Sequence, residues 1–414
     1  MKIPRDRHWD CTLALMADPY RYISQTCQKL NSQVFQTRFL LTQTICLTGQ
    51  EAAALFYDPQ HFQRQGAAPF RLRATLFGFG GVQGLDGERH RQRKQMFLTV
   101  TTGPHVPILV DLFERAWRRE IQATPPETTI CLYEQFQSVL CRTATEWAGV
   151  DIPDAEFPQW QRDIVALFDR AGAIGMPHWL ARWSRQSAQG RMKHWIREIR
   201  SGQRQVAPDS AAQVIAHYRE PNGKLLDDRT AAVELLNVIR PIVAVSVYLT
   251  FTALALHQYP GCRTALVSSD PRNVAWFAQE IRRFYPFFPA LVARARETFT
   301  WNSFEFRRGS RVLLDIYGIN HDPAVWRDPT DFRPQRFNEQ DVTPFNFLPQ
   351  GGGDAANGHR CPGEEIATAL IERTAKLLVN QISWKVPEQN LAIDYTRLPA
   401  LPKSRFLINQ IRIS

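Results

Sequence analysis

The sequence has few cysteines, and their spacing follows no pattern. Seven cysteines are spread over 414 residues, without the pairing of a disulfide framework or the close pairs that hold zinc. Disulfide-rich secreted scaffolds and zinc modules are therefore excluded, and a reducing compartment is expected. The seven are Cys11, Cys27, Cys46, Cys131, Cys141, Cys262 and Cys361.

Long hydrophobic runs are missing as well. Residues 1–10 are polar and lack the apolar core of a signal peptide. The longest predominantly apolar run, 241–256, is shorter than the roughly 20 residues that cross a bilayer. These features predict a soluble, cytoplasmic protein without a transmembrane anchor.

Charge of one sign forms no tail at either end of the chain. The net charge is +10, from 50 basic and 40 acidic residues, yet most of the basic residues are spread through segments that also contain acids. Without a basic tail or an RNA-binding motif, this is the charge of a solvated surface that helps to attract anionic acids or membranes, and no nucleic acid partner is expected. A hydrophobic fraction of 44% indicates a large buried core, and no linker or repeat divides the chain.

Cys361 differs from the other cysteines because it lies in a glycine-rich loop, 349–363, that leads directly into an apolar helical segment, 364–371. Glycines allow the backbone to wrap closely around the sulfur. Pro362 suits the first turn of a helix, and a helix N-terminus favours the thiolate form of a cysteine. The pattern indicates a thiolate that binds a metal, and a buried structural cysteine is the alternative.

Arg240 and Pro241 stand out inside the apolar segment 230–256. An internal proline removes a backbone hydrogen bond and kinks a helix, commonly at a functional opening. An arginine at such a kink is a charge in apolar surroundings and requires an anionic partner. That partner is either a structural carboxylate elsewhere in the fold or the carboxylate of a bound substrate.

Strand patterns are few and lie towards the two ends of the chain. We expect a strand pair at 37–48 and a strand-and-loop tail after Pro387. The alternating segments 298–306 and 311–317 flank a turn at 307–310, which predicts a hairpin.

Three motifs follow one another in the C-terminal half. Glu280 and Arg283 have the spacing of one helical face, where an acid and a guanidinium can pair. The segment 326–337 comes next, and the Cys361 loop follows it. In this order the motifs resemble the cytochrome P450 family over most of the chain.

The resemblance implies both an architecture and a cofactor. It implies a single domain of residues 1–414 with a mainly α fold and a minor β region. It also implies heme b, with Cys361 as the axial thiolate ligand of the iron, and a buried network of Glu280, Arg283 and Arg336. A member of this family without an anchor is expected to be bacterial.

Two departures from the usual family pattern indicate one branch. Asp354 stands where common members have phenylalanine, and the loop is lengthened by 351–353. Arg240-Pro241 replaces the acid and threonine that usually deliver protons in the central helix. These features resemble the fatty-acid peroxygenase branch, which uses hydrogen peroxide directly. Further segments that resemble the branch are 56–59, 66–69 and 75–87.

The branch implies roles for three residues. Arg240, followed by Pro241, would hold the carboxylate of a free fatty acid through two parallel hydrogen bonds. That carboxylate would act as the general acid-base for hydrogen peroxide, so that no redox partner is required. Gln83 stands where hydroxylases of the branch have glutamine and the best-known alkene-forming decarboxylase has histidine. Glutamine therefore favours hydroxylation at the α or β carbon.

Basic and aromatic residues complete the expected site. His90, Lys94 and Arg360 are expected to bind the heme propionates, and a solvated basic face is the alternative. Four phenylalanines are candidates for lining an acyl-chain tunnel, or else are plain core aromatics. They are Phe77, Phe79, Phe287 and Phe288, the last of which stands where the branch has glycine.

Other functions remain open at this point. A fatty-acid decarboxylase that forms terminal alkenes requires the same anchor. A conventional monooxygenase fed by a redox partner is disfavoured because the acid-threonine pair is missing. A non-catalytic heme sensor is disfavoured because it has no need of a carboxylate anchor such as Arg240.

Overall fold

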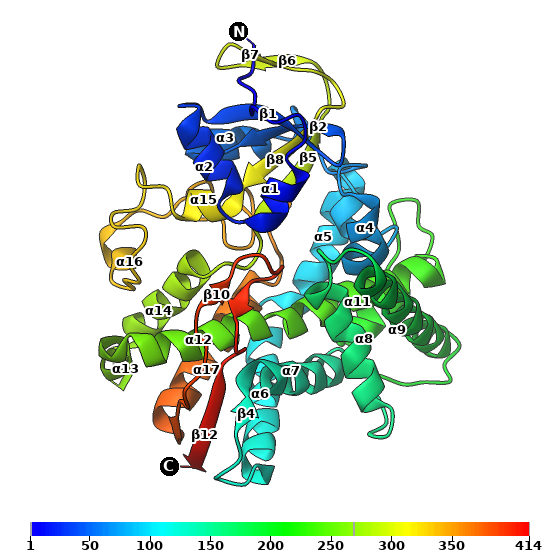
Figure 1. The fold of residues 1–414 in the computed structure, drawn as a ribbon. Coiled ribbons are helices and arrows are strands. Elements are labelled where there is room, and N and C mark those ends of the chain that lie inside the picture. The colour runs from blue at the N-terminus through cyan, green and yellow to red at the C-terminus, as the bar shows by residue number, and fades with distance from the viewer. Residues whose placement is uncertain (1, 268–269, 414) are drawn as a thin grey trace.

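The computed structural model describes residues 2–267 and 270–413. Helices make up about half of it, and the largest group of strands lies with the N-terminal segments at one end (Figure 1). The predicted fold, mainly α with a minor β region, is confirmed. The helices are α1 (Thr12–Ala17), α2 (Tyr22–Lys29), α3 (Gln50–Phe56), α4 (Phe70–Leu72), the π-helical turn η1 (Arg73–Phe77), the 3-10 turn η2 (Val82–Gly84), α5 (Gly87–Thr101), α6 (His105–Ala123), α7 (Leu132–Trp147), α8 (Phe157–Asp169), α9 (Met176–Arg200), α10 (Ala211–His217), α11 (Asp228–Ala244), α12 (Ser246–Gln258), α13 (Pro260–Val267), α14 (Pro271–Phe284), α15 (Ile316–Asn320), α16 (Arg336–Glu339) and α17 (Glu364–Asn380).

The strands form one sheet of five and three smaller sheets. The large sheet has the order β1-β2-β8-β5-β3, in which β2 and β8 are parallel and the other neighbours are antiparallel. The smaller sheets are β4-β12-β9, β10-β11 and β6-β7. The strands are β1 (Val34–Phe39), β2 (Thr42–Leu47), β3 (Phe62–Gln63), β4 (Ile130–Cys131), β5 (Ala290–Ala295), β6 (Phe299–Trp301), β7 (Phe304–Phe306), β8 (Arg311–Asp315), β9 (Ile382–Lys385), β10 (Ile393–Asp394), β11 (Leu401–Pro402) and β12 (Leu407–Ile413).

Two of the three strand predictions are confirmed. The pair expected at 37–48 is the antiparallel hairpin of β1 and β2, although β1 begins at Val34. The tail after Pro387 contains β10, β11 and β12, as predicted.

The predicted hairpin between 298–306 and 311–317 is wrong. The first segment folds on itself instead, because Asn302 and Ser303 adopt positive φ angles of 46° and 67° and form a tight turn between β6 and β7. The strand β8 pairs with β5 and β2 rather than with this segment. The local turn outweighed the alternating pattern because two residues in the left-handed region suffice to reverse a strand.

The central helix pair α11 and α12 runs through the middle of the molecule (Figure 1). Helix α11 packs against α7, α8 and α9, and α12 packs against α7, α14 and α17. Pro241 lies inside α11, as the sequence predicts, and Val245 separates the two helices.

The stretch Asp228–Gln258 meets the length and apolarity of a membrane span, and 94% of its most apolar window is buried within the protein. Among the described residues, the pair α5 and α6, which meet at 51°, passes the same test only together. Burial on all sides gives a core helix this composition.

The buried network of Glu280, Arg283 and Arg336 is confirmed. The carboxylate of Glu280 accepts hydrogen bonds from Nε of Arg283 at 2.8 Å and from Nε of Arg336 at 3.1 Å, and all three side chains are fully buried. Arg283 also donates to the carbonyl oxygens of Asn320 and Pro329. The network therefore attaches α14 to the segment that precedes the Cys361 loop.

Candidate functional site

The loop that carries Cys361 is held by backbone contacts. The backbone N–H of Cys361 donates to the carbonyl oxygen of Gln350 at 3.1 Å, and that of Gly353 donates to Pro344 at 3.0 Å. A Cβ at Gly352 would lie 2.2 Å from Cδ2 of Leu348 and 2.3 Å from the Pro344 oxygen. Only glycine fits at position 352, which explains the lengthened glycine run.

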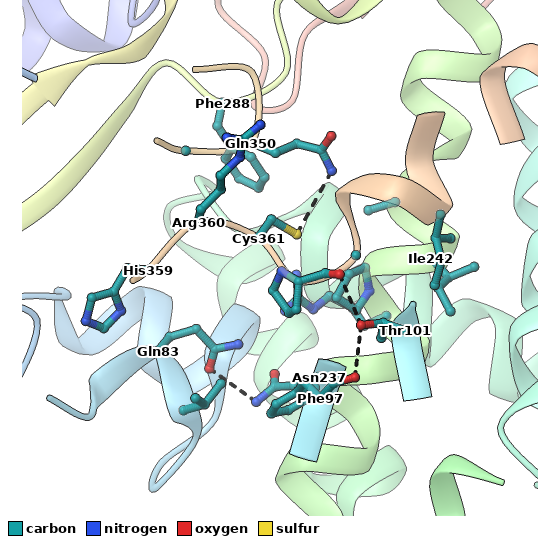
Figure 2. A pocket seen from close by; sticks show the side chains of 18 of the residues that line it. Gln83, Phe97, Thr101, Asn237, Ile242, Phe288, Gln350, His359, Arg360 and Cys361 are labelled. Carbon is teal, nitrogen blue, oxygen red and sulfur yellow. Dashed lines mark hydrogen bonds between the residues drawn. The ribbon is translucent and has the colours of Figure 1, made fainter. Parts of the chain in front are cut away.

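Cys361 lies just before α17, which begins at Glu364 as predicted. Its Sγ atom is 4.0 Å from Nε2 of Gln350 (Figure 2). Burial raises the pKa of the Cys361 thiol, while the backbone N–H of Gly363 and the cations Lys94 and Arg240 act to lower it. The helix N-terminus alone therefore does not secure the thiolate here, and a bound metal ion is the group that deprotonates such a thiol.

Cys361 lines a cavity of about 1340 Å³, open solvent included, between its loop, α5, α11 and α12. A cavity of this size, with the reactive sulfur of Cys361 in its lining, is typical of a ligand-binding site. The lining includes nine of the eleven residues that the sequence nominates for the site. They are Gln83, His90, Lys94, Arg240, Pro241, Phe287, Phe288, Arg360 and Cys361.

Phe77 and Phe79 do not belong to this lining. Phe77 packs against the main hydrophobic core, and Phe79 packs against Phe70 with their ring centroids 5.5 Å apart. The structure thus separates these two phenylalanines from Phe287 and Phe288, and their contact with an acyl chain stays a prediction.

Arg240 is a buried cation of the cavity that has no carboxylate partner among the described residues. Its side chain is 6% exposed, and Nε has no hydrogen-bond partner. No described carboxylate pairs with it, so the structural partner considered from the sequence is absent from residues 2–267 and 270–413. Burial and the nearby Arg185 lower the pKa of Arg240 to about 9, whereas the charge of Cys361 raises it. The guanidinium remains cationic at neutral pH and is available to an anionic ligand.

Gln83 is held in place by a chain of hydrogen bonds that the sequence did not reveal. Nδ2 of Asn237 donates to Oε1 of Gln83 at 3.2 Å and to Oε2 of Glu234 at 2.9 Å (Figure 2). Glu234 in turn binds Arg93 at 2.6 Å. Because Oε1 of Gln83 is engaged, its amide nitrogen is the group left to donate to a ligand.

The spacing of Asn237 offered a signal that sequence reasoning missed. It precedes Arg240 by three residues on α11, which places both side chains on one helical face, and both line the cavity. Gln350, beside the sulfur of Cys361, carried no such signal because a loop has no periodicity.

The basic residues near Cys361 have partners of their own. Lys94 donates from Nζ to the carbonyl oxygens of Gly358, at 3.0 Å, and Arg360. The guanidinium of Arg360 pairs with Glu364, with Nη2 and Oε1 2.9 Å apart. Lys94 therefore fastens α5 to the Cys361 loop.

His90 lies against a second histidine rather than against an acid. Its ring and that of His359 have centroids 3.8 Å apart. Burial and the neighbouring cations lower the pKa of His90 to about 3, so the imidazole is neutral and serves as a hydrogen-bond donor or acceptor. A heme-binding role for His90, Lys94 and Arg360 remains a prediction.

The residues present suit heme b. A buried sulfur lies at one wall, on a loop that a larger side chain would disrupt, and cationic or donor groups lie beside it. The remaining lining is largely apolar, as a macrocycle and an acyl chain require. Its apolar members include Val82, Phe97, Val238, Ile242, Ala244, Val245, Leu291 and Ile366.

A family comparison agrees with this geometry. The model of the cytochrome P450 family matches residues 274–408, the region that contains the Glu280 network and Cys361. Among curated proteins, cytochrome P450 71D18 of Mentha gracilis is 31% identical over 135 residues, which are 31% of this chain and 26% of the relative. Ferruginol synthase of Isodon rubescens is 30% identical over 122 residues, 28% of this chain and 24% of the relative. The matched region thus spans about a quarter of each relative.

Solved structures match over the whole length. Cytochrome P450SP alpha (CYP152B1) in complex with (R)-ibuprophen has a TM-score of 0.95 and 48% identity, and the match covers 98% of this chain and 99% of that chain. Cytochrome P450EX alpha (CYP152N1) with myristic acid has a TM-score of 0.95, 37% identity and full coverage of both chains. A variant of cytochrome P450 OleT in complex with arachidonic acid has a TM-score of 0.96 and 32% identity, over 100% of this chain and 99% of that chain.

Proposed function

Because this chain belongs to the cytochrome P450 family and carries that family's thiolate-ligated heme b, we propose that it is a peroxygenase that uses hydrogen peroxide to hydroxylate free fatty acids at the α or β carbon. The observation that carries the proposal is the buried Arg240, which has no protein anion and lines the same cavity as Cys361. Three solved relatives that hold carboxylic acids, ibuprophen, myristic acid and arachidonic acid, support it.

Arg240 would bind the substrate carboxylate. Its planar guanidinium can form two parallel charge-assisted hydrogen bonds with a carboxylate, and burial strengthens them by excluding water. An anchored carboxylate places the first carbons of the acyl chain in the cavity that Cys361 lines. Non-carboxylate molecules are then poor substrates, because they leave a buried cation without a partner.

The carboxylate of the bound substrate would also transfer the proton that the cleavage of hydrogen peroxide requires. Among the described residues that line the cavity there is no aspartate or glutamate. Thr101 is the lining threonine, and its hydroxyl contacts the carbonyl oxygens of Phe97 and Pro362 (Figure 2). A carboxylate held by Arg240 can accept a proton from one oxygen of hydrogen peroxide and return it to the other. The heme, when bound through Cys361, supplies the oxidising chemistry, which a thiolate ligand promotes by donating electron density.

Gln83, Pro241, Phe287 and Phe288 would shape the reaction. Pro241 lacks the N–H that would bond the carbonyl oxygen of Asn237, which keeps the helix open beside Arg240. The amide nitrogen of Gln83 is directed by Asn237 and favours hydroxylation over decarboxylation. Phe287 and Phe288 line the cavity with their ring centroids 4.7 Å apart, which narrows the space for the acyl chain.

The proposal also covers the reactants, the partners and the cellular compartment. Hydrogen peroxide and free fatty acid are the reactants, and neither a redox partner nor a membrane anchor nor a nucleic acid is required. The chain acts as one domain in the cytoplasm of a bacterium. The seven free cysteines support a reducing compartment.

The test is product analysis by mass spectrometry. The purified ferric protein is mixed with myristic acid and hydrogen peroxide, without reductase or NADPH, and the expected products are 2-hydroxy or 3-hydroxy acids. A terminal alkene as the main product would convert the assignment to a decarboxylase. Product formation only after addition of a reductase system would overturn the peroxygenase assignment in favour of a monooxygenase.

A further inference from the structure

Helix α9 carries a second buried arginine whose charge has no partner. Arg185 is 3% exposed, and its Nε and Nη2 atoms are buried without a hydrogen-bond partner. Nη1 makes one long contact, 3.4 Å, with the carbonyl oxygen of Thr75. Burial lowers the pKa of Arg185 to about 10, so the side chain is still cationic at neutral pH. A buried cation with so few partners is costly unless an anion joins it.

The nearest acid is already engaged. The charge of Glu234 raises the pKa of Arg185, yet its carboxylate pairs with Arg93 at 2.6 Å and forms no ion pair with Arg185. The backbone is shaped around the Arg185 guanidinium instead, because a Cβ at Gly78 would lie 2.1 Å from Nη2 and the φ angle there is +78°. Glycine at position 78 makes room for this charge.

Arg185 borders a pocket that is separate from the cavity at Cys361. This second pocket encloses about 770 Å³, open solvent included, and the two linings share no residue. It lies between α9, η1 and the start of α11. Helices α9 and α11 lie side by side (Figure 1), and η1 packs against α9. Arg182, Lys193 and Arg229 line it as well, and none of the described lining residues is acidic. Four cations without an acid make a site for a negatively charged group.

The rim of the second pocket is aromatic. Phe79 lines the pocket and packs against Phe70, and the guanidinium of Arg182 lies 5.7 Å from the ring centroid of Phe70 and 4.6 Å from that of Trp179. Phe70 is 59% exposed and Trp179 is 51% exposed. Exposed aromatic rings next to cations are the surface that an amphiphile with an anionic head contacts.

We propose that this pocket binds the anionic head group, a carboxylate or a phosphate, of an amphiphile whose apolar tail lies on the aromatic rim. Arg185 is the buried anchor, and Lys193 and Arg229 draw the anion to the pocket. The site holds such a molecule outside the cavity at Cys361. It shares no residue with the reaction site, although the charge of Arg185 lies near enough to Arg240 to lower the pKa of Arg240.

The test is calorimetric titration of the heme-loaded protein with monomeric dodecyl phosphate. The Arg240→Ala background removes the anion anchor of the main cavity, so that one binding site is expected to remain. Adding Arg185→Met is expected to weaken that site at least roughly tenfold, because charge-assisted hydrogen bonds are lost. The heme absorption spectrum and circular dichroism report whether the variant is folded.

Variants at Lys193 and Arg229, the outer cations of the pocket, decide the matter if Arg185→Met does not fold. Lys193→Gln with Arg229→Gln is expected to weaken binding several-fold, whereas Lys224→Gln, an exposed lysine outside the pocket, is the matched control and leaves it unchanged. Equal affinity for dodecyl phosphate in the Lys193→Gln, Arg229→Gln double variant and in the Lys224→Gln control would overturn the proposal. Inorganic phosphate binding as tightly as dodecyl phosphate would overturn the role of the aromatic rim.

Two further titrants identify the source of the head group. Lauric acid represents the free acid, and phosphatidylcholine vesicles with or without phosphatidylglycerol represent a lipid surface. Binding of lauric acid with no affinity for vesicles assigns a free amphiphile. Vesicle binding that requires phosphatidylglycerol and is reduced by Trp179→Ser and Phe70→Ser assigns a phospholipid.

Discussion

Asn237 donates a hydrogen bond from Nδ2 to Oε1 of Gln83 at 3.2 Å, and thereby ties the loop before α5 to the helix that carries Arg240 (Figure 2). The loop passes so close to α11 that a Cβ at Gly81 would lie 2.8 Å from the same Nδ2 atom. The direction in which the Gln83 amide points is therefore set by Asn237.

Replacing Asn237 tests this relationship. Asn237→Leu removes the donor to Gln83 and also the side-chain donor to the buried Oε2 of Glu234, which is expected to lower the free energy of unfolding by about 1–3 kcal/mol. We expect the ratio of 2-hydroxy to 3-hydroxy acid to change as well, since the Gln83 amide loses its orientation. Chemical unfolding and product analysis measure the two effects. Gln83→Ala should shift the ratio in the same direction, and an effect of one variant without the other would contradict the link.

Arg240→Ala is expected to abolish fatty-acid turnover while the heme content stays intact. Both the anchor and the positioned acid-base would be lost, and the latter alone contributes roughly a hundredfold to ten-thousandfold to a rate. The rate of peroxide-driven hydroxylation of myristic acid is the measurement. Arg91→Ala, an exposed arginine on α5, is the matched control. Peroxide-driven activity retained in Arg240→Ala would exclude carboxylate-assisted catalysis.

The close packing of the glycine run before Cys361 is expected to be needed for heme retention. Gly352→Ala would place a methyl group 2.2 Å from Leu348 and 2.3 Å from the Pro344 carbonyl oxygen, so the loop must shift. We expect a reduced heme content, measured from the ratio of heme to protein absorbance. Gly261→Ala, in α13 and outside the cavity lining, is the control, since a Cβ there would meet nothing within 4 Å. A fully loaded Gly352→Ala protein would show that the close packing is dispensable.

Asp315 predicts a dependence of stability on pH. Burial raises the pKa of its carboxyl to about 7, although its Oδ1 accepts the Gly318 N–H at 2.7 Å. Between about pH 4 and about pH 7 the unfolded chain binds fewer protons at this residue than the folded protein, so this contribution to stability falls as the pH rises. Asp315→Asn keeps an acceptor for Gly318 and removes the titrating proton. Its urea midpoint should fall less over this window than that of the wild type, and identical pH profiles would contradict the prediction.

Local patterns predicted the helical start at Glu364, the β1–β2 hairpin and the proline inside α11, because each depends on residues that are near one another in the chain. The hairpin predicted around 307–310 failed for the converse reason. The partner of β8 is β5 on one side and β2 on the other, and no local rule selects a strand from so far along the chain.

The sequence by itself determined the motif order, the mainly α fold and the choice of Cys361 and Arg240 as site residues. Residue spacing, glycine content and a charge inside an apolar segment can all be recognised without knowing the tertiary structure. Only the tertiary structure decided that Arg240 has no protein anion, that Asn237 directs Gln83, and that Phe79 borders a second pocket with Arg185. These relations join α5, α9, α11 and the loops between them. They arise from the packing of segments that are distant in the chain, and packing is decided by the shapes of all partners at once.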